Sequence, residues 1–158
     1  MSHLEGGCTC RAVRFRLTAP PMFVHCCHCR WCQRETGSAF VLNAMIEAEN
    51  VEVTGDVVFV DIPTLSGRGQ RVARCPQCQI ALWSNYGGRG DIVRFVRVGT
   101  LDNPDAVPPD AHIFTDSKVP WVLLPPGVAA FGEFYDRAAV WPAAARDRLR
   151  AAMARAAR

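Results

Sequence analysis

The sequence predicts a mainly β domain with short helical turns and one C-terminal helix. Three observations lead to this class: short segments that alternate or are rich in β-branched residues, glycine and proline between them, and a late run of alanine and arginine that follows Pro142. With 158 residues, the chain is long enough to bury a single hydrophobic core. No apolar run approaches the roughly 18 residues that a membrane span requires, so we expect no membrane partner.

The N-terminal third predicts three strands and one short helix. Residues 13–17 alternate apolar side chains with arginines, which is the pattern of a strand with one buried face. Residues 22–25 predict a second short strand. Residues 30–36 predict one or two helical turns that end at Gly37, and residues 38–46 return to a strand.

The middle of the chain predicts further strands separated by glycine-containing turns. These segments are β-branched or alternating, and they cover residues 51–54, 57–62, 70–74, 81–85 and 92–98. We expect the first three to form a meander that leads into Cys75, and we expect the glycine-rich link at 87–90 to be a turn. Residues 101–126 are rich in proline and predict an extended loop that contains residues 111–114 and can cover a site.

The C-terminal segment differs from the rest in composition. Residues 137–158 hold six arginines against the single acid Asp147, and Leu149 and Met153 stand one helical turn apart. We therefore divide the chain into one domain at 1–136 and a basic helical tail at 137–158 that packs on the same domain. Arginines near a helix end also complement the helix dipole, so nucleic acid is not expected as a partner.

Cysteine spacing is the strongest chemical signal in the chain. Of eight cysteines, seven fall into three tight groups, and these groups are Cys8 with Cys10, Cys27 with Cys29 and Cys32, and Cys75 with Cys78. The sequence opens with MSHLEGG, in which no basic segment precedes an apolar one, so we expect a cytoplasmic protein and reduced thiols. In that setting, closely spaced cysteines indicate metal ligands rather than disulfides.

Two of the groups supply a complete structural zinc site. Such sites are usually closed by four protein ligands, often from two cysteine pairs that are distant in sequence. Cys8, Cys10, Cys75 and Cys78 provide four thiolates and would tie the first strand to the middle of the sheet. Loss of this site is expected to unfold the domain.

The remaining group, Cys27, Cys29 and Cys32, has one ligand fewer than a closed site needs. Three protein ligands with one exchangeable position are typical of catalytic zinc. Three thiolates give the ion a net charge near −1 and suit it to accept another sulfur. The sequence therefore predicts a second zinc that binds a thiol.

Four other side chains are candidates to close this second site. Cys26 precedes Cys27 directly, but adjacent residues of an extended chain point to opposite faces, so we interpret Cys26 as a small buried residue. We interpret His25 as a hydrogen-bonded histidine at a strand end and His28 as a solvent-facing loop residue. His112 is the fourth candidate.

The ordered set of GGCTC at 6–10, CHCRWCQRETGSAF at 27–40 and CPQC at 75–78 resembles the glutathione-dependent formaldehyde-activating enzyme family, including its centromere protein V-like domains. The stretch at 112–121 is similar to the C-terminal signature of the family. The resemblance implies a β-tent of stacked antiparallel sheets with two zinc ions per chain. It also implies reversible joining of glutathione to formaldehyde as S-hydroxymethylglutathione, a carbon–sulfur lyase reaction. The position after Cys10 is usually glycine in that family and is Arg11 here.

The pocket residues are predicted from charge and from their place in these motifs. Arg30, Arg34 and Lys118 are candidates to offset thiolate charge or to hold a substrate carboxylate. Ser38, His112 and Trp121 are candidates to line the cleft, with Trp121 also a candidate for the core.

Two classes of function remain open on the sequence alone. The first is a zinc-dependent enzyme that handles a thiol adduct of a small aldehyde, with glutathione as its partner. The second is a non-catalytic zinc-stabilised module that binds protein or nucleic acid. A fourth protein ligand at the second site would favour the module, because no position would remain for substrate. The sequence permits a homo-oligomer with either function.

Overall fold

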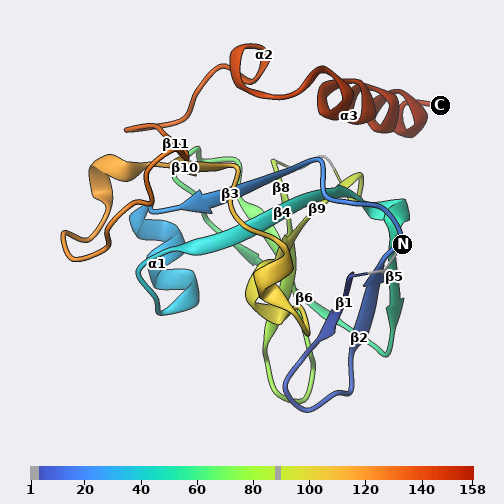
Figure 1. Ribbon diagram of the computed structural model, residues 1–158. Coiled ribbons are helices and arrows are strands. Elements are labelled where there is room, and N and C mark those ends of the chain that lie inside the picture. Colours follow the sequence, from blue (N-terminus) through green and yellow to red (C-terminus); the bar gives the residue numbers. More distant parts are fainter. Residues whose placement is uncertain (1–3, 88–89) are drawn as a thin grey trace.

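The protein is described here by a computed structural model that covers residues 4–87 and 90–158. Its strands form two sheets (Figure 1). The small sheet has the order β1-β2-β5 and the large sheet the order β11-β10-β3-β4-β9-β8-β7-β6. This arrangement confirms the mainly β class predicted from the sequence.

The small sheet consists of β1 (Leu4–Gly7), β2 (Arg14–Leu17) and β5 (Val51–Thr54). The large sheet consists of β3 (Phe23–Cys27), β4 (Val41–Glu47), β6 (Val58–Ile62), β7 (Gln70–Arg74), β8 (Ala81–Tyr86), β9 (Val93–Arg97), β10 (Ala111–Ile113) and β11 (Ala129–Ala130). The α-helices are α1 (Arg30–Thr36), α2 (Arg137–Val140) and α3 (Ala143–Ala156). Short 3-10 turns occur at Ala48–Asn50, Val98–Thr100, Pro104–Ala106 and Thr115–Ser117.

Alternation along β4 divides the interior between the two faces of the large sheet. Ala44 and Ile46 point into a core shared with Phe15 of the small sheet. Met45 points the other way and packs with Trp141, which precedes α3. Because side chains alternate along a strand, β4 is buried on both faces.

The C-terminal segment covers the face of the large sheet that is opposite the small sheet. Trp141 and Ala145 are buried against Phe23, and the rings of Phe23 and Trp141 stack with their centroids 5.0 Å apart. Figure 1 shows α2 and α3 lying beyond the large sheet on the side away from β1, β2 and β5. The predicted C-terminal helix is confirmed, with Pro142 at its N-cap.

Helix α1 follows the sequence prediction closely. It begins after Cys29, whose sulfur accepts a hydrogen bond from the Cys32 backbone N–H. It ends at Gly37, which adopts φ +62°. Glycine is favoured there because it has no Cβ to oppose the left-handed conformation.

Two expectations about the strands were wrong. The segment β5 does not continue into a meander with β6, because it pairs with β2 in the small sheet. Within residues 101–126, Ala111–Ile113 is not a loop, since it forms β10 and pairs in parallel with β3. Both pairings join segments far apart in the chain, which local patterns do not specify.

Two further predictions concern the glycine-rich turn and membrane-spanning helices. The turn expected at 87–90 includes residues 88 and 89, which lie outside the described residues. Throughout the described part of the chain, every helix is too short or too polar to cross a lipid bilayer.

Candidate metal centres and the adjoining cavity

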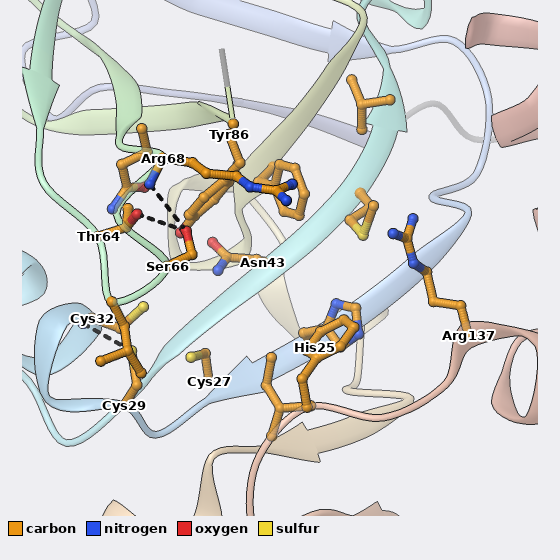
Figure 2. A pocket seen from close by; sticks show the side chains of 18 of the residues that line it. His25, Cys27, Cys29, Cys32, Asn43, Thr64, Ser66, Arg68, Tyr86 and Arg137 are labelled. Atoms are coloured by element: carbon orange, nitrogen blue, oxygen red, sulfur yellow. Dashed lines mark hydrogen bonds between the residues drawn. The ribbon is translucent and has the colours of Figure 1, made fainter. Parts of the chain in front are cut away.

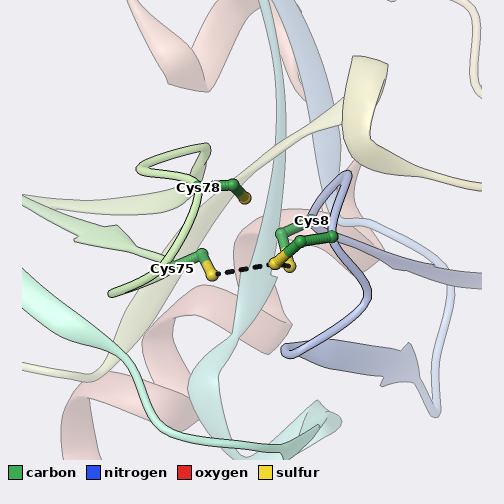
Figure 3. Close-up of side chains that lie close together, drawn as sticks. Cys8, Cys75 and Cys78 are labelled. Atoms are coloured by element: carbon green, nitrogen blue, oxygen red, sulfur yellow. Dashed lines mark hydrogen bonds between the residues drawn. The ribbon is translucent and has the colours of Figure 1, made fainter.

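Four cysteines meet where the small sheet lies against the large one. Cys8 and Cys10 follow β1, and Cys75 and Cys78 follow β7 (Figure 3). Their sulfur atoms all lie within 4.8 Å of one another. Cys8 and Cys75 are buried, whereas Cys10 is exposed. The structure thus brings together the four side chains that the sequence pairs.

The sulfur separations in this group fit a shared ion and not a disulfide. The Cys10 sulfur lies 3.5 Å from that of Cys8 and 3.6 Å from that of Cys75. A disulfide requires about 2.05 Å, whereas sulfurs at about 2.3 Å from a tetrahedral zinc stand roughly 3.8 Å apart. The donor set of four thiols is also that of a closed structural zinc site.

Backbone amides support the sulfurs of this group. The Val13 N–H donates to the Cys8 sulfur over 3.3 Å, and the Gln77 N–H donates to the Cys75 sulfur over 3.4 Å. The turn that permits this geometry contains Arg11 at φ +65°. A positive φ favours glycine, which gives a physical reason for the glycine usual at this position.

The second group comprises Cys27 at the end of β3, Cys29 at the N-cap of α1 and Cys32 in its first turn. Their sulfurs also lie within 4.8 Å of one another. Among the residues that the structure describes, no other cysteine, histidine or carboxylate joins this group. The set therefore stays at three ligands.

The three thiols of this group do not share one protonation behaviour. Hydrogen bonds from Cys27 and Cys32 lower the pKa of Cys29 to about 2. The pKa of Cys27 is raised by its hydrogen bonds to Cys29 and Cys32 and by burial. The hydrogen bonds among the three sulfur atoms therefore stabilise a thiolate within the group.

His28 is not the solvent-facing residue that we expected. It is fully buried, and its Nε2 lies 2.9 Å from Nδ1 of His112 and 3.6 Å from the Cys26 sulfur. These three side chains form a separate group of possible metal ligands, and Cys26 lies on the opposite face of β3 from Cys27. The opposite faces of Cys26 and Cys27 follow from strand alternation.

The backbone at His28 anchors the second cysteine group to a distant segment. The His28 N–H donates to the Ile113 carbonyl over 3.0 Å. Its carbonyl accepts from Gln33 Nε2 over 2.7 Å and from the Ser117 hydroxyl over 3.0 Å. These bonds hold the Cys27–Cys29 stretch against β10 and the turn that follows it.

The second cysteine group opens onto a cavity of about 560 Å³. Because β3, β4 and β9 each present alternate side chains to it, the floor includes His25, Asn43, Met45 and Phe95. Figure 2 shows the three cysteines on one side of this cavity and Arg137 on the other, with Arg68 beside Tyr86. The size lies within the range of small-molecule sites, roughly 300–1,000 Å³.

A hydrogen-bond chain fixes one side of the cavity. The Trp141 indole N–H donates to the Tyr135 hydroxyl over 2.7 Å, and that hydroxyl lies 2.5 Å from His25 Nε2. The Tyr135 hydroxyl therefore links His25 to Trp141. Burial, followed by the charge of Arg137, lowers the pKa of His25 to about 4, so this histidine is neutral at pH 7.

A buried ion pair lies beneath α1. The Arg97 guanidinium donates to Glu35 Oε2 over 3.1 Å and also to the side chains of Asn43 and Ser84. The other Glu35 oxygen accepts from Arg74. Since Glu35 belongs to α1, the pair locks the helix that carries Cys32 onto β7 and β9.

The six predicted pocket residues do not line the cavity. Arg30, Arg34 and Ser38 are exposed on α1 and the loop after it. His112 is buried with His28, and the Lys118 ammonium donates to the Val119 and Val122 carbonyls. The alternative of Trp121 as a core residue is wrong, because this side chain is 74% exposed.

Sequence reasoning missed most of the residues that do line the cavity. Arg68 comes from the loop between β6 and β7, and Tyr86 from β8. Leu149 and Met153 were recognised only as an apolar stripe of the C-terminal helix. That stripe was the available signal, because a helix needs an apolar face only where another surface meets it.

The fold and these sites define a mainly β protein with cysteine groups that can hold metal ions. The sequence model of the family "Glutathione-dependent formaldehyde-activating enzyme" matches residues 3–117. The chain belongs to this family, as the resemblance of its cysteine motifs implied.

Two individual proteins are similar to this chain. A Halomonas elongata protein, provisionally named a glutathione-dependent formaldehyde-activating enzyme, is 29% identical over 128 residues, which cover 77% of this chain and 80% of that protein. A crystal structure of a Rhodobacter sphaeroides protein matches with a TM-score of 0.45 and 14% identity, over 80% of this chain and 98% of the other.

Proposed function

We propose that this protein is a zinc-dependent enzyme that joins and separates a thiol and a small aldehyde, with carbon–sulfur lyase chemistry of the S-hydroxymethylglutathione type. One observation carries the proposal. The group of Cys27, Cys29 and Cys32 has three ligands and borders a cavity large enough for a substrate. A binding module stabilised by zinc would not need an open ligand position next to a cavity.

The donor chemistry supports two zinc ions per chain with different roles. Cys8, Cys10, Cys75 and Cys78 would hold a structural ion, since four thiols within 4.8 Å complete a tetrahedron. Cys27, Cys29 and Cys32 would hold the second ion. When bound there, zinc supplies a position that lowers the pKa of a substrate thiol and keeps it as a thiolate.

The protein's own side chains would bind and orient the substrate. Arg68 and Arg137 line the cavity and suit the carboxylates of glutathione. Burial, together with the charge of Cys32, raises the pKa of Tyr86. The Tyr86 hydroxyl therefore keeps its proton and can donate a hydrogen bond to the aldehyde oxygen as the carbon–sulfur bond forms.

The reaction with glutathione and formaldehyde tests this function. Zinc-loaded wild-type protein should accelerate formation of S-hydroxymethylglutathione, measured by exchange NMR. Cys29→Ser should lose at least about a hundredfold in rate, because it removes one of three ligands, and should keep its circular dichroism spectrum.

Cys26→Ser provides the matched control, since it removes a neighbouring buried thiol that lies outside both proposed zinc sites. This variant should retain its rate. Equal rates for wild type and Cys29→Ser, or loss of rate only in Cys26→Ser, would exclude the assignment.

A further inference from the structure

The cavity is walled by a part of the chain that lies beyond the family match. That match ends at residue 117, yet Phe134, Arg137, Trp141, Leu149 and Met153 all line the cavity. Trp141 and Leu149 also pack on the large sheet with Met45. The wall is therefore a fixed part of the fold and not a loose tail.

The interior of this wall is apolar. Leu149, Met153 and Trp141 line the cavity together with the apolar side chains of Met45, Val93 and Phe95. A hydroxymethyl group offers these side chains nothing to pack against, since its single carbon is little larger than a water molecule of about 30 Å³. Glutathione itself is a polar tripeptide. An apolar compartment in a cavity of about 560 Å³ implies a ligand with an apolar part of its own.

The charge of the cavity lining indicates that the same ligand also has an anionic part. Among the described lining residues, the charged side chains are Arg68 and Arg137, and none is an aspartate or glutamate. Within residues 4–87 and 90–158, neither guanidinium forms an ion pair. Both are thus available to a substrate carboxylate.

We propose that the physiological electrophile is an aldehyde with an alkyl or aryl substituent, and that Trp141, Leu149 and Met153 form the pocket for that substituent. This inference rests on the proposed function. The thiol sulfur bonds to the carbonyl carbon, the π pair of the C=O bond moves to the oxygen, and that oxygen takes the proton that the thiol gives up. The product is a hemithioacetal, and its cleavage reverses each step without net oxidation or reduction.

Binding of two stable adduct analogues tests the pocket without depending on turnover. S-hexylglutathione and S-methylglutathione differ only in the apolar group on sulfur. Each methylene moved from water into an apolar site is worth about fourfold in affinity. We expect zinc-loaded protein to bind the hexyl compound at least about tenfold more tightly than the methyl compound, as measured by isothermal titration calorimetry.

Met153→Trp and Ala154→Trp form a matched pair of variants. Met153 lines the cavity, whereas the neighbouring Ala154 is exposed and does not line it. The tryptophan at 153 should fill the apolar compartment and remove the hexyl preference, and the one at 154 should leave it unchanged. Leu149→Ala is a second variant of the wall, and we expect it to weaken hexyl binding about fourfold or more.

The inference is overturned if wild type binds both analogues equally, or if Met153→Trp and Leu149→Ala keep the wild-type ratio while folded. Acceleration of formaldehyde adduct formation without a hexyl preference would remove the inference and leave the proposed function. A hexyl preference that depends on Met153, without acceleration of any adduct, would remove the proposed function and leave the apolar ligand site.

Discussion

At the scale of residues, Glu35 shows how a buried charge is held in this protein. Its side chain is only 5% exposed, and each carboxylate oxygen accepts from a different arginine, Arg74 or Arg97. A buried charge without a partner is costly, whereas a fully paired one is tolerated. Glu35 therefore orients the helix that carries Cys32 at little net cost.

Glu35→Gln should lower the free energy of unfolding by about 3 kcal/mol, because it leaves buried guanidinium groups without a counter-charge. Glu52→Gln is the matched control. It removes a partner of Arg16 in a pair whose side chains are 57% and 44% exposed, so its effect should stay below about 1 kcal/mol. Urea unfolding measures both, and equal effects would contradict the role given to burial.

The sequence could predict the ligand residues but not the surroundings of each side chain. Cysteine spacing is a local property, and the structure groups these side chains as the spacing indicated. The burial of His28 depends on His112, Ile113 and Ser117, which are more than 80 positions away. No local pattern contains that information.

At the scale of elements, α3 is held on the large sheet by a two-point ion pair. Arg148 donates to both carboxylate oxygens of Glu47, over 2.8 and 2.6 Å, and to the Pro20 carbonyl over 2.9 Å. Glu47 ends β4, so the bond ties the cavity wall to the central strand. Two charge-assisted bonds in parallel fix direction as well as distance.

This pair predicts a pH dependence of stability. Burial raises the pKa of Glu47, but the hydrogen bonds from Arg148, the backbone and Asn50, together with the charge of Arg148, outweigh burial, and the net pKa lies below 4.5. A lowered folded pKa contributes stability that is present above the unfolded value and lost as pH falls through the folded one.

Arg148→Ala should therefore cost about 2 kcal/mol at neutral pH, and its difference from wild type should shrink below about pH 4.5. Denaturant unfolding between pH 3 and 7 measures this. A difference that is constant over the whole range would contradict the pairing.

Strand positions were largely predictable, whereas strand partners were not. The segments 51–54 and 70–74 have the predicted bounds as β5 and β7. Periodicity of two shows which residues face one way, but it does not show which strand lies alongside. This is why the sequence predicts β5 beside β6, and why it predicts a loop where the three residues of β10 lie.

At the scale of the whole molecule, the large sheet separates two cysteine sites. The group of Cys8, Cys10, Cys75 and Cys78 belongs to the core between the sheets, whereas Cys27, Cys29 and Cys32 line the cavity on the other face. The first group joins segments 65 positions apart in the chain, so an ion there would stabilise the fold. The second joins a strand to the helix that follows it, and its loss would leave the sheets intact.

The division of the chain at residue 137 stays a prediction. Helix α3 packs on the large sheet through Ala145 and Leu149, and it contributes to the cavity wall. The interpretation of 137–158 as a basic tail missed this contribution. Arginines dominate the composition of the segment, whereas the apolar side chains of Ala145 and Leu149 pack it on the sheet.

Zinc content per folded chain tests most directly whether one cysteine site is structural and the other is catalytic. We expect two zinc ions in wild type and one in Cys29→Ser, with an unchanged circular dichroism spectrum, whereas Cys75→Ser should give insoluble or unfolded protein. Two ions retained in Cys29→Ser, or a folded and soluble Cys75→Ser, would contradict the account.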